Sequence, residues 1–485
     1  MTTSTFSSTQ NLLPEAILLL GAIICAGLGV LRRGAATRTF MAVSGLTLVA
    51  AALSSLVYLR GLPGGGYDSY ASALVVDRFT LLVLPVLCGL ALLTVLSSDV
   101  LAERLGPHCG EYHALILTAT LGGALLASAR DMVALFVALE LLSVSLYVLV
   151  GLVKTEPRGS EAAFKYLILG AASTATLLYG LAVLYGLTGT TVLVDVAHGL
   201  HHTGPAAAFG IALALVGMAF KLGAVPFHQW VPDVYEGAPA PVAGLIASLS
   251  KLAGFAMVAR FAVTALPLSA STWTAVIAVV AASSMVYGNL AALAQRRMRR
   301  LLACSSIGQA GFILMGLLAY GSGEDGIGSA LFYLLTYGIT LVGIFAAVTA
   351  AEAGGVTDDL ASYRGLWARS PVASVTIGVG MWSLLGIPPF IGFFAKLFVF
   401  QSALLAGWGW LVVVAVAATV VSAAYYLRVL RVIFIDSPAD AAEELDPEPL
   451  PLRVGLIACA GATVFLGVIA QPLMHVATAA GQQLP

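Results

Sequence analysis

The sequence predicts an all-α integral membrane protein with about 14 transmembrane helices. Sixty per cent of the 485 residues are hydrophobic and only 10% are charged, which excludes a soluble domain of this size. Apolar runs of about 18 to 25 residues recur along the chain, and each can cross a hydrocarbon core of about 30 Å as a helix. Because lipid offers no hydrogen-bond partners, the backbone must be satisfied within these helices.

Fourteen spans can be assigned along the chain. Residues 1–10 carry no basic residue ahead of the first span, so this span is expected to stay in the membrane and not to be cleaved as a signal peptide. Because the number of spans is even, both termini are expected on one side of the membrane. In chain order the spans cover residues 13–32, 38–59, 76–98, 112–129, 131–153, 160–187, 205–225 with an extension to about 236, 240–262, 272–294, 299–320, 327–351, 371–402, 407–434 and 452–475.

The basic residues indicate which side the termini occupy. They gather in alternate loops, and the positive-inside rule places such loops in the cytoplasm. The opposite loops hold only Arg60, Arg78, Arg130 and Arg260, so both termini are predicted on the outer, periplasmic side of a bacterial plasma (inner) membrane. The fifteen residues on the cytoplasmic side are Arg32, Arg33, Arg38, Arg104, Lys154, Arg158, Arg296, Arg297, Arg299, Arg300, Arg364, Arg369, Arg428, Arg431 and Arg453.

Four of the five lysines fall inside predicted spans, at Lys165, Lys221, Lys251 and Lys396. A lysine at the centre of a span costs about 2.5–3.5 kcal/mol unless it is paired, hydrated or deprotonated. The loops use arginine almost exclusively, which indicates that lysine is placed selectively in the interior. Static packing could explain one such residue, but four in one chain favour a function.

Lysine suits proton transfer better than arginine does. An arginine stays charged at any accessible pH, whereas a desolvated lysine can release and recapture a proton. Among the acidic residues, Glu140 lies in mid-span, in "MVALFVALELLSVSLYVLV". A carboxylate stays ionised beside a lysine and tends to take up a proton when that partner is removed. Glu140 and a lysine can therefore form a switchable pair.

Two of the spans contain residues that interrupt a helix. Proline removes a helical hydrogen bond and clashes with the preceding turn. We therefore expect a broken helix in the seventh span, beside Lys221, and another in the twelfth span, beside Lys396; a kink that only aids packing is the alternative. The interrupting residues are Gly223 and Pro226 in "KLGAVPFHQWVPD" and Gly386, Pro388 and Pro389 in "LLGIPPFIGFFAKLFVF".

The two expected breaks lie five spans apart, so their helices cross the membrane in opposite directions. This spacing predicts two inverted five-helix repeats, about helices 4–8 and 9–13, each with one broken helix. Secondary transporters place ion sites in the interrupted helices of such repeats. The predicted regions are 1–105 for helices 1–3, 106–265 for the first repeat, 266–436 for the second, inverted repeat, and 437–485 for a cytoplasmic loop and the last helix.

The segments around the breaks carry a family resemblance. "FKLGAVPFHQWVPDVYEGAPAPVAGLIASLSK" (220–251) and "GIPPFIGFFAKLFVF" (386–400) resemble the two signature regions of the antiporter-like subunits of proton-pumping NADH:quinone oxidoreductase, respiratory complex I. "EAAFKYLILG" (161–170) is similar to the lysine-bearing sixth helix of that family. The chain is most similar to subunit N, because Lys251 stands where subunits L and M usually have histidine. One departure is Ala243, where relatives often have threonine.

The resemblance implies a role for each of the five charges. Glu140 and Lys221 would be the paired switch, and Lys165 would tune or bridge them. Lys251 would be the central relay, and Lys396 would be the exit or link toward a neighbouring repeat.

Two further residues lie near the first break. His228 would either join proton uptake or hold the loop in place, and Asp233 would shape the second half of the broken helix.

No segment of the chain is suited to carry electrons. The sequence contains no cysteine cluster for an iron–sulfur centre, no haem CxxCH and no Rossmann fingerprint, and the five scattered cysteines are expected to be small core residues. No metal or cofactor is therefore expected on this chain. The resemblance implies that NADH, FMN, iron–sulfur clusters and quinone bind to other subunits of a hetero-oligomeric membrane complex, and that no nucleic acid is involved.

Two alternatives remain open. A subunit of a multi-subunit cation/proton antiporter or of a membrane-bound hydrogenase would use the same helices and the same buried lysines, and would differ in its driving partner. A structural subunit that no longer transports would only hold partners together through its apolar faces. The retained ionisable groups argue against the second alternative.

Overall fold

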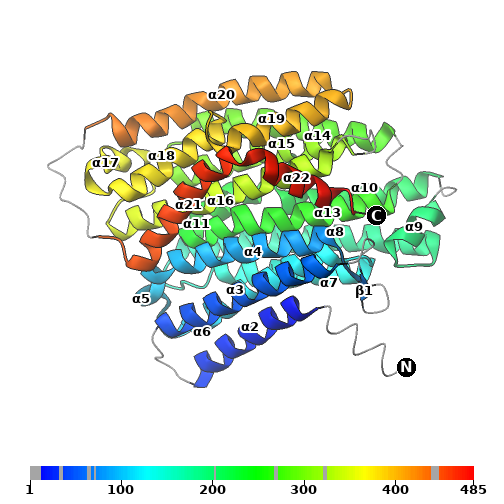
Figure 1. Cartoon of the computed structure of the whole chain (residues 1–485), viewed down its shortest axis with the longest axis horizontal. Helices are drawn as coiled ribbons and strands as arrows, with labels where there is room; N and C mark the ends of the chain where they lie inside the picture. The colour runs from blue at the N-terminus through cyan, green and yellow to red at the C-terminus, as the bar shows by residue number, and fades with distance from the viewer. Residues whose placement is uncertain are drawn as a thin grey trace.

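The computed structural model is a bundle of long helices that run along one common direction (Figure 1). α2 lies at one edge of the bundle and α20 at the opposite edge, with α13 and α16 between them (Figure 1). The structure describes residues 12–31, 37–62, 67–69, 73–200, 204–266, 271–320, 325–437 and 447–484. Most of the predicted cytoplasmic loop after residue 437 lies outside these ranges.

The helices and strands have the following bounds. The long helices are α2 (Leu13–Leu31), α3 (Thr37–Gly61), α4 (Arg78–Ser97), α6 (Cys109–Ser128), α7 (Met132–Val150), α8 (Pro157–Thr188), α10 (Gly204–Leu222), α13 (Lys251–Ala265), α14 (Ser271–Ala294), α15 (Met298–Leu318), α16 (Gly326–Ala353), α18 (Pro371–Leu385), α19 (Ile391–Leu405), α20 (Gly409–Phe434), α21 (Leu450–Val468) and α22 (Ala470–Gly481). The short elements are the strands β1 (Tyr67–Ser69) and β2 (Leu74–Val76), the helices α5 (Ala102–Leu105), α9 (Leu193–Gly199), α11 (Trp230–Gly237), α12 (Ala240–Leu245) and α17 (Leu366–Arg369), and the turns η1 (Asp99–Leu101), η2 (Gly106–His108), η4 (Ile246–Ser250) and η5 (Leu360–Tyr363).

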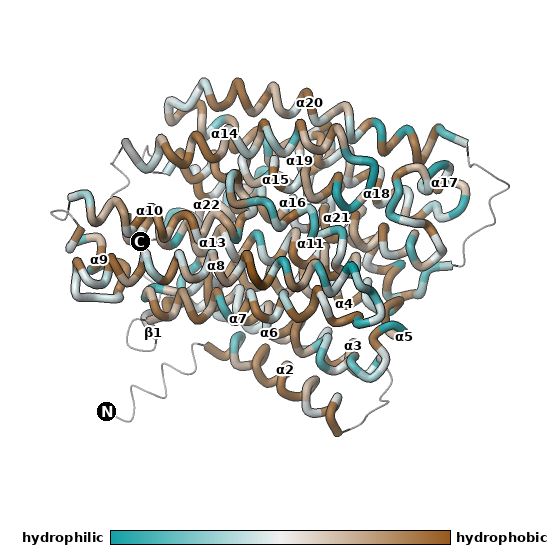
Figure 2. The backbone as a smooth tube through the Cα atoms, turned by 180° about the vertical axis from the view of Figure 1, so that it is seen from behind, coloured by the Kyte–Doolittle hydropathy of each residue, from teal (hydrophilic) through white to brown (hydrophobic). Residues whose placement is uncertain are grey.

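The membrane spans follow the sequence prediction. In the described part of the chain, twelve helices are long and apolar enough to cross a membrane. Two shorter apolar helices, α18 and α19, fill the predicted span 371–402, and α6 fills the predicted span 112–129. Hydrophobic residues cover most of the helix lengths, and hydrophilic segments gather at the end that carries α5 and α17 (Figure 2). The predicted all-α membrane architecture is confirmed.

The core of the bundle lies on a few central helices. In the spans 240–265 and 298–318 the most apolar stretch is buried throughout, and in α16 it is 89% buried. Only 28% of the corresponding stretch of α8 is buried. The outer helices therefore present apolar side chains to lipid or to partner subunits, while the central helices can hold groups that water does not reach.

Both predicted helix breaks are present. α10 ends just before Gly223 (φ +66°), and α18 ends just before Gly386 (φ +88°). Positive φ values favour glycine because it has no Cβ atom. Three residues after each glycine, Pro226 or Pro389 follows a cis peptide bond, the second of them the Pro388–Pro389 bond. The two breaks thus share the same local arrangement.

Two features of the span 240–265 differ from the prediction. The span is not a uniform α-helix, because Ile246–Ser250 form a π-helical turn directly before Lys251. Such turns occur frequently at functional sites.

Arg260, which the charge pattern had assigned to an outer loop, lies within α13 with a fully buried side chain. It stays inside because its guanidinium bonds both carboxylate oxygens of Asp77, at 2.6 and 3.2 Å, and the Ala127 carbonyl at 2.6 Å.

All five cysteines are buried and free, as predicted for small core residues.

Candidate functional site

Three of the predicted interior lysines are buried at interruptions of helical structure. The side chains of Lys221, Lys251 and Lys396 are 4%, 4% and 5% exposed. Lys221 is in the last turn of α10, before the first break, and Lys251 follows the π-helical turn. Lys396 lies in α19, just after the second break. Each lysine therefore sits where the backbone hydrogen-bonding pattern changes.

Lys221 has a neutral partner. Its Nζ donates to Ser143 Oγ on α7 at 3.0 Å. The carbonyl end of a helix favours a cation, which suits the position of Lys221 at the end of α10. A Cβ atom at Gly254, on α13, would lie 3.2 Å from Lys221 Cγ, so α13 packs closely on the lysine stem. Lys221 is thus held between α7 and α13, the helix that also carries Lys251.

Glu140 does not pair directly with Lys221. In the described part of the chain the two side chains form no ion pair, and Glu140 Oε1 has no hydrogen-bond partner. On α7, Glu140 falls in register with a stripe of exposed valines. Glu140 lies along this stripe, but it is half-buried and its Oε1 atom is itself buried. The members of the stripe are Val133, Val137, Val144 and Val148, which are 45–57% exposed.

Lys251 connects three helices. Its Nζ donates to the Ser306 carbonyl at 2.6 Å and to Ser306 Oγ at 2.7 Å, on α15. The same ammonium lies 5.5 Å from the centroid of the Tyr337 ring on α16, within the range of a cation–π contact. Ser306 Oγ also shares a 3.2 Å hydrogen bond with the Tyr235 hydroxyl. Lys251 is thereby linked to α11, the second half of the first broken helix.

Lys396 depends on the second break. Its Nζ donates to the Leu385 carbonyl at 3.0 Å, and Leu385 is the last residue of α18. The last carbonyls of a helix lack intrahelical partners, so the break supplies this acceptor. A Cβ atom at Gly386 would lie 3.1 Å from Lys396 Cδ, so glycine also leaves room for the lysine stem. On its other side the ammonium lies 5.2 Å from the Phe312 ring centroid.

Lys165 differs from the other three lysines, and its expected burial is corrected. Its side chain is 43% exposed, because it lies near the end of α8 that carries Arg158. Its Nζ lies 2.8 Å from Glu161 and 2.9 Å from Asp233. Asp233 also accepts a 3.1 Å hydrogen bond from Arg300 on α15. These groups line a cavity of about 160 Å³, with Arg158 and Glu236.

His228 lies inside the first break and is 8% exposed. Its ring centroid is 4.3 Å from that of Tyr287 on α14, and in the described structure its Nδ1 has no hydrogen-bond partner. It does not join the ion pairs of Asp233. The two accessory residues therefore have different surroundings, packing for His228 and an open charged cavity for Asp233.

Several site residues were missed by sequence reasoning. Hydroxyl and amide side chains on α15, α16 and α20 form buried hydrogen bonds between Lys251 and Lys396. The sequence signal was the cluster of polar residues at 305, 306 and 309 within an otherwise apolar span, but serine and glutamine alone do not distinguish a site from packing. The residues are Ser305, Ser306, Gln309, Tyr333 and Tyr426.

Comparisons with known proteins agree with this geometry. A family described as NADH:quinone oxidoreductase/Mrp antiporter, TM matches residues 129–422. Among similar proteins, NAD(P)H-quinone oxidoreductase subunit 2 of Synechococcus sp. (strain JA-3-3Ab) is 39% identical, over 99% of this chain and 93% of the relative. The same-named subunit of Synechocystis sp. (strain ATCC 27184 / PCC 6803 / Kazusa) is 37% identical, over 96% of this chain and 92% of the relative.

Solved structures also match over nearly the whole chain. A chain of respiratory complex I from Thermus thermophilus with bound aureothin has a TM-score of 0.80 and 34% identity, covering 96% of this chain and 99% of that chain. A chain of the membrane-bound sulfane sulfur reductase, an archaeal respiratory membrane complex, has a TM-score of 0.89 and 25% identity over 98% of both chains. A chain of the Mrp complex from Dietzia sp. DQ12-45-1b, at 24% identity and a TM-score of 0.85 over 97% of both chains, shares the fold.

Proposed function

This chain belongs to the NADH:quinone oxidoreductase/Mrp antiporter family of membrane proteins, and from this premise we propose that it is the subunit N type of proton-translocating subunit in a complex I-like NAD(P)H:quinone oxidoreductase. In this proposal the chain moves protons through buried lysines, while neighbouring subunits reduce quinone. NADH, FMN, iron–sulfur clusters and quinone bind to those partners. Among the described residues no group of three or more His, Cys, Asp or Glu side chains could hold a metal ion.

One observation carries the proposal. Lys221, Lys251 and Lys396 are each almost fully buried, and each meets an uncharged oxygen instead of a carboxylate. A lysine locked in an ion pair would keep its proton, whereas a desolvated lysine with neutral partners is free to lose it. Three such groups on neighbouring central helices form a series of proton-binding sites.

The first transfer involves Lys221 and Lys251. Gly254 lies one turn beyond Lys251 on α13, and it packs against the stem of Lys221 on α10. The two lysines are therefore both located at the contact between α10 and α13. When a neighbouring subunit shifts the charge near Glu140, the electrostatic potential at Lys221 changes. Lys221 then gives its proton to Lys251 through intervening water, and Lys251 passes it on toward Lys396.

The charged cavity around Asp233 is the proposed site of proton uptake. It lies at the end of α8 that carries Arg158, and Asp233 is shared between Lys165 and Arg300. Exchange between these two partners would free the carboxylate to take a proton. Lys165 then acts at the surface of the uptake route and not as an interior relay.

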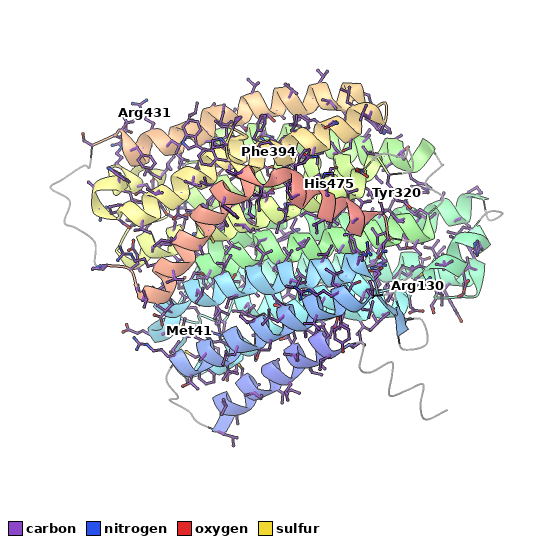
Figure 3. The ribbon with its side chains drawn as sticks, in the orientation of Figure 1. Met41, Arg130, Tyr320, Phe394, Arg431 and His475 are labelled. Atoms are coloured by element: carbon purple, nitrogen blue, oxygen red, sulfur yellow. The ribbon has the colours of Figure 1, made fainter. Side chains whose placement is uncertain are left out.

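The arginine distribution supports the orientation of the chain. Arg431 lies at one end of the bundle and Arg130 lies at the opposite end (Figure 3). α2 begins, and α22 ends, at the end that carries Arg130 (Figures 1 and 3). By the positive-inside rule we propose that the end with Arg431 faces the cytoplasm, which puts the start of α2 and the end of α22 on the outer side of a bacterial inner membrane.

The matching breaks support an internal repeat. We propose that residues 106–265 and 266–436 are the two inverted repeats, each with one broken helix, preceded by helices 1–3 and followed by a final helix. The shared glycine conformation at the two breaks, and the burial of a lysine beside each, are the supporting observations.

Replacing Lys221 tests the function. We expect Lys221→Ala to assemble into the complex, because the lysine forms a single neutral hydrogen bond, and to lower the number of protons moved per electron by half or more. The control is Lys154→Ala, which removes an exposed lysine. Proton uptake and NAD(P)H:quinone reductase activity are measured on the purified complex in proteoliposomes. An unchanged proton yield in the Lys221→Ala complex would contradict the proposal.

The fold likeness to the Mrp complex favours one second candidate, a subunit of a cation/proton antiporter. The driving partner distinguishes the two functions. Purification of the tagged chain in mild detergent is expected to bring down NAD(P)H:quinone reductase activity with its partner subunits. Recovery of antiporter or hydrogenase subunits in its place would favour the second candidate, with the same proton path.

A further inference from the structure

One side of α15 connects the surroundings of Lys251 with those of Lys396. Ser306 bonds Lys251, and Phe312 lies under Lys396. Gln309 lies between them in the sequence, and Ser305, four residues before Gln309, shares its helix face. The four α15 side chains are at most 3% exposed. A proton that passes from Lys251 to Lys396 must therefore cross this dry region of the bundle.

Most of the region is bridged by hydrogen bonds. The Ser305 hydroxyl shares a 2.5 Å hydrogen bond with the Tyr426 hydroxyl of α20. Gln309 Nε2 donates to the same hydroxyl at 3.2 Å, and the Tyr333 hydroxyl of α16 donates to Gln309 Oε1. Because the Gln309 amide both donates and accepts, it fixes the positions of the two tyrosines. The bonded chain thus runs from Ser305, the neighbour of Ser306 on α15, as far as Tyr333, and in the described structure no hydrogen bond joins it to Ser306 or Lys251.

The chain stops at an aromatic ring. Phe312 is 1% exposed, and its ring stacks on Tyr333 with a centroid separation of 6.2 Å and an interplanar angle of 23°. Lys396 Nζ lies 5.2 Å from the centroid of the same ring. In the described structure no hydrogen bond joins Tyr333 to Lys396; the only bond of the Lys396 ammonium goes to Leu385. Phe312 therefore separates the hydroxyl chain from the lysine.

We propose that Phe312 is a gate that controls proton access to Lys396. The inference rests on the proposed function, because it concerns the same path. Proton transfer needs continuous hydrogen bonds, and a hydrocarbon ring supplies none. The protonated ammonium is attracted to the ring, so a charged Lys396 holds the gate closed. When Lys396 loses its proton the attraction is lost, the ring can turn aside, and water can connect Lys396 with Tyr333 for the next transfer.

In this arrangement Gln309 is a positioning residue. It touches neither lysine, but it holds the Tyr333 ring against which Phe312 stacks. Protons can therefore reach Lys396 only after the Phe312 ring has moved, and this prevents a continuous proton leak across the bundle.

The test uses the assembled complex in proteoliposomes. Phe312→Ala is expected to raise the passive proton permeability of the resting complex several-fold and to lower the protons moved per electron, while quinone reduction continues. A leak that passes through Lys396 must disappear when Lys396→Met is added to Phe312→Ala. A Phe312→Ala complex that is as proton-tight as wild type and fully coupled would overturn the gate.

Two variants make the result specific. Phe332→Ala is the matched control, because Phe332 is fully buried and packs on Phe398 with ring centroids 5.1 Å apart, and in the described structure neither ring lies under a lysine ammonium. Phe332→Ala should destabilise the complex as much as Phe312→Ala does, but it should not raise the passive proton permeability. If Phe312→Ala does not assemble, Phe312→Met keeps the volume and removes the aromatic face, and a tight, fully coupled Phe312→Met complex also counts against the gate.

The proposed function is tested separately by Lys396→Met alone. A normal proton yield in that variant would contradict the proposed proton-translocating function. If Lys396→Met lowers the proton yield but Phe312→Ala has normal proton permeability and normal proton yield, only the gate proposal is contradicted.

Discussion

Lysine and arginine have different roles in this chain at the residue scale. The buried lysines Lys221, Lys251 and Lys396 meet hydroxyl or carbonyl oxygens, so they can lose a proton without breaking an ion pair. Arg260, by contrast, is fully buried and is held by the carboxylate of Asp77. Because arginine stays charged, it suits a permanent link and not a relay.

The ion pair of Asp77 and Arg260 is expected to stabilise the protein. Asp77→Asn should destabilise the protein by about 3–5 kcal/mol, because it leaves the buried Arg260 guanidinium without its counter-charge. The double variant Asp77→Leu, Arg260→Met should recover much of the loss, since no charge is then left unpaired. Thermal unfolding of the purified complex measures both effects.

The matched control is an exposed pair. Arg104 and Glu156 are 52% and 36% exposed, and Arg104→Ala should cost about 0–1 kcal/mol. If Asp77→Asn costs no more than Arg104→Ala, the buried link does not hold α4 and α13 together.

At the scale of elements, the helix interruptions determine where the lysines can lie. A continuous helix offers a lysine no free carbonyl, whereas the end of α18 offers that of Leu385. The second break requires glycine at position 386 for two reasons. Gly386 has a φ of +88°, and the Lys396 side chain approaches it closely. The π-helical turn before Lys251 is the third interruption.

The two reasons at Gly386 can be separated by experiment. Gly386→Ala should cost about 1–2 kcal/mol for the left-handed backbone and should also push the Lys396 stem aside, which lowers the proton yield. Gly407→Ala is the control, because Gly407 has a φ of +86° and open space around it. Both variants should unfold at a lower temperature than wild type.

Only Gly386→Ala should change the number of protons moved per electron. Equal proton yields in the two variants would show that the contact between Gly386 and Lys396 has no role in transport.

At the scale of the whole molecule, the unpartnered carboxylate of Glu140 indicates that the switch is incomplete in a single chain. Glu140 lies among exposed valines on α7, and it has no ion-pair partner within the described chain. A carboxylate is costly in lipid, so this face is expected to be covered by a neighbouring subunit with a group of opposite charge. The coupling to quinone reduction then enters through α7.

Replacing Glu140 tests this coupling. Glu140→Gln should leave the stability of the chain nearly unchanged, because the carboxylate has no internal partner, and should lower the proton yield of the assembled complex by half or more. Proton-to-electron ratios in proteoliposomes are the measurement. Glu103→Gln, an exposed acidic residue outside the spans, serves as the control. A normal ratio for Glu140→Gln would exclude a switch at this position.

The membrane spans, the two helix breaks and the buried lysines could be predicted from the sequence because they depend on local properties. Run length sets a span, and glycine and proline set a break, whatever the neighbouring helices are. The spans and the breaks at Gly223 and Gly386 accordingly lie where the sequence predicted them. The roles of the lysines and the repeat boundaries stay predictions.

The tertiary structure decided which of these charges are dry and what they meet. Burial depends on which face of a helix turns toward its neighbours, so only the packed bundle shows that Lys165 is half exposed and that Glu140 has a buried oxygen without a hydrogen-bond partner in the described structure. The same packing hides Arg260 beside Asp77 and stacks Phe312 between Tyr333 and Lys396. These contacts join helices far apart in the sequence, and no local pattern encodes them.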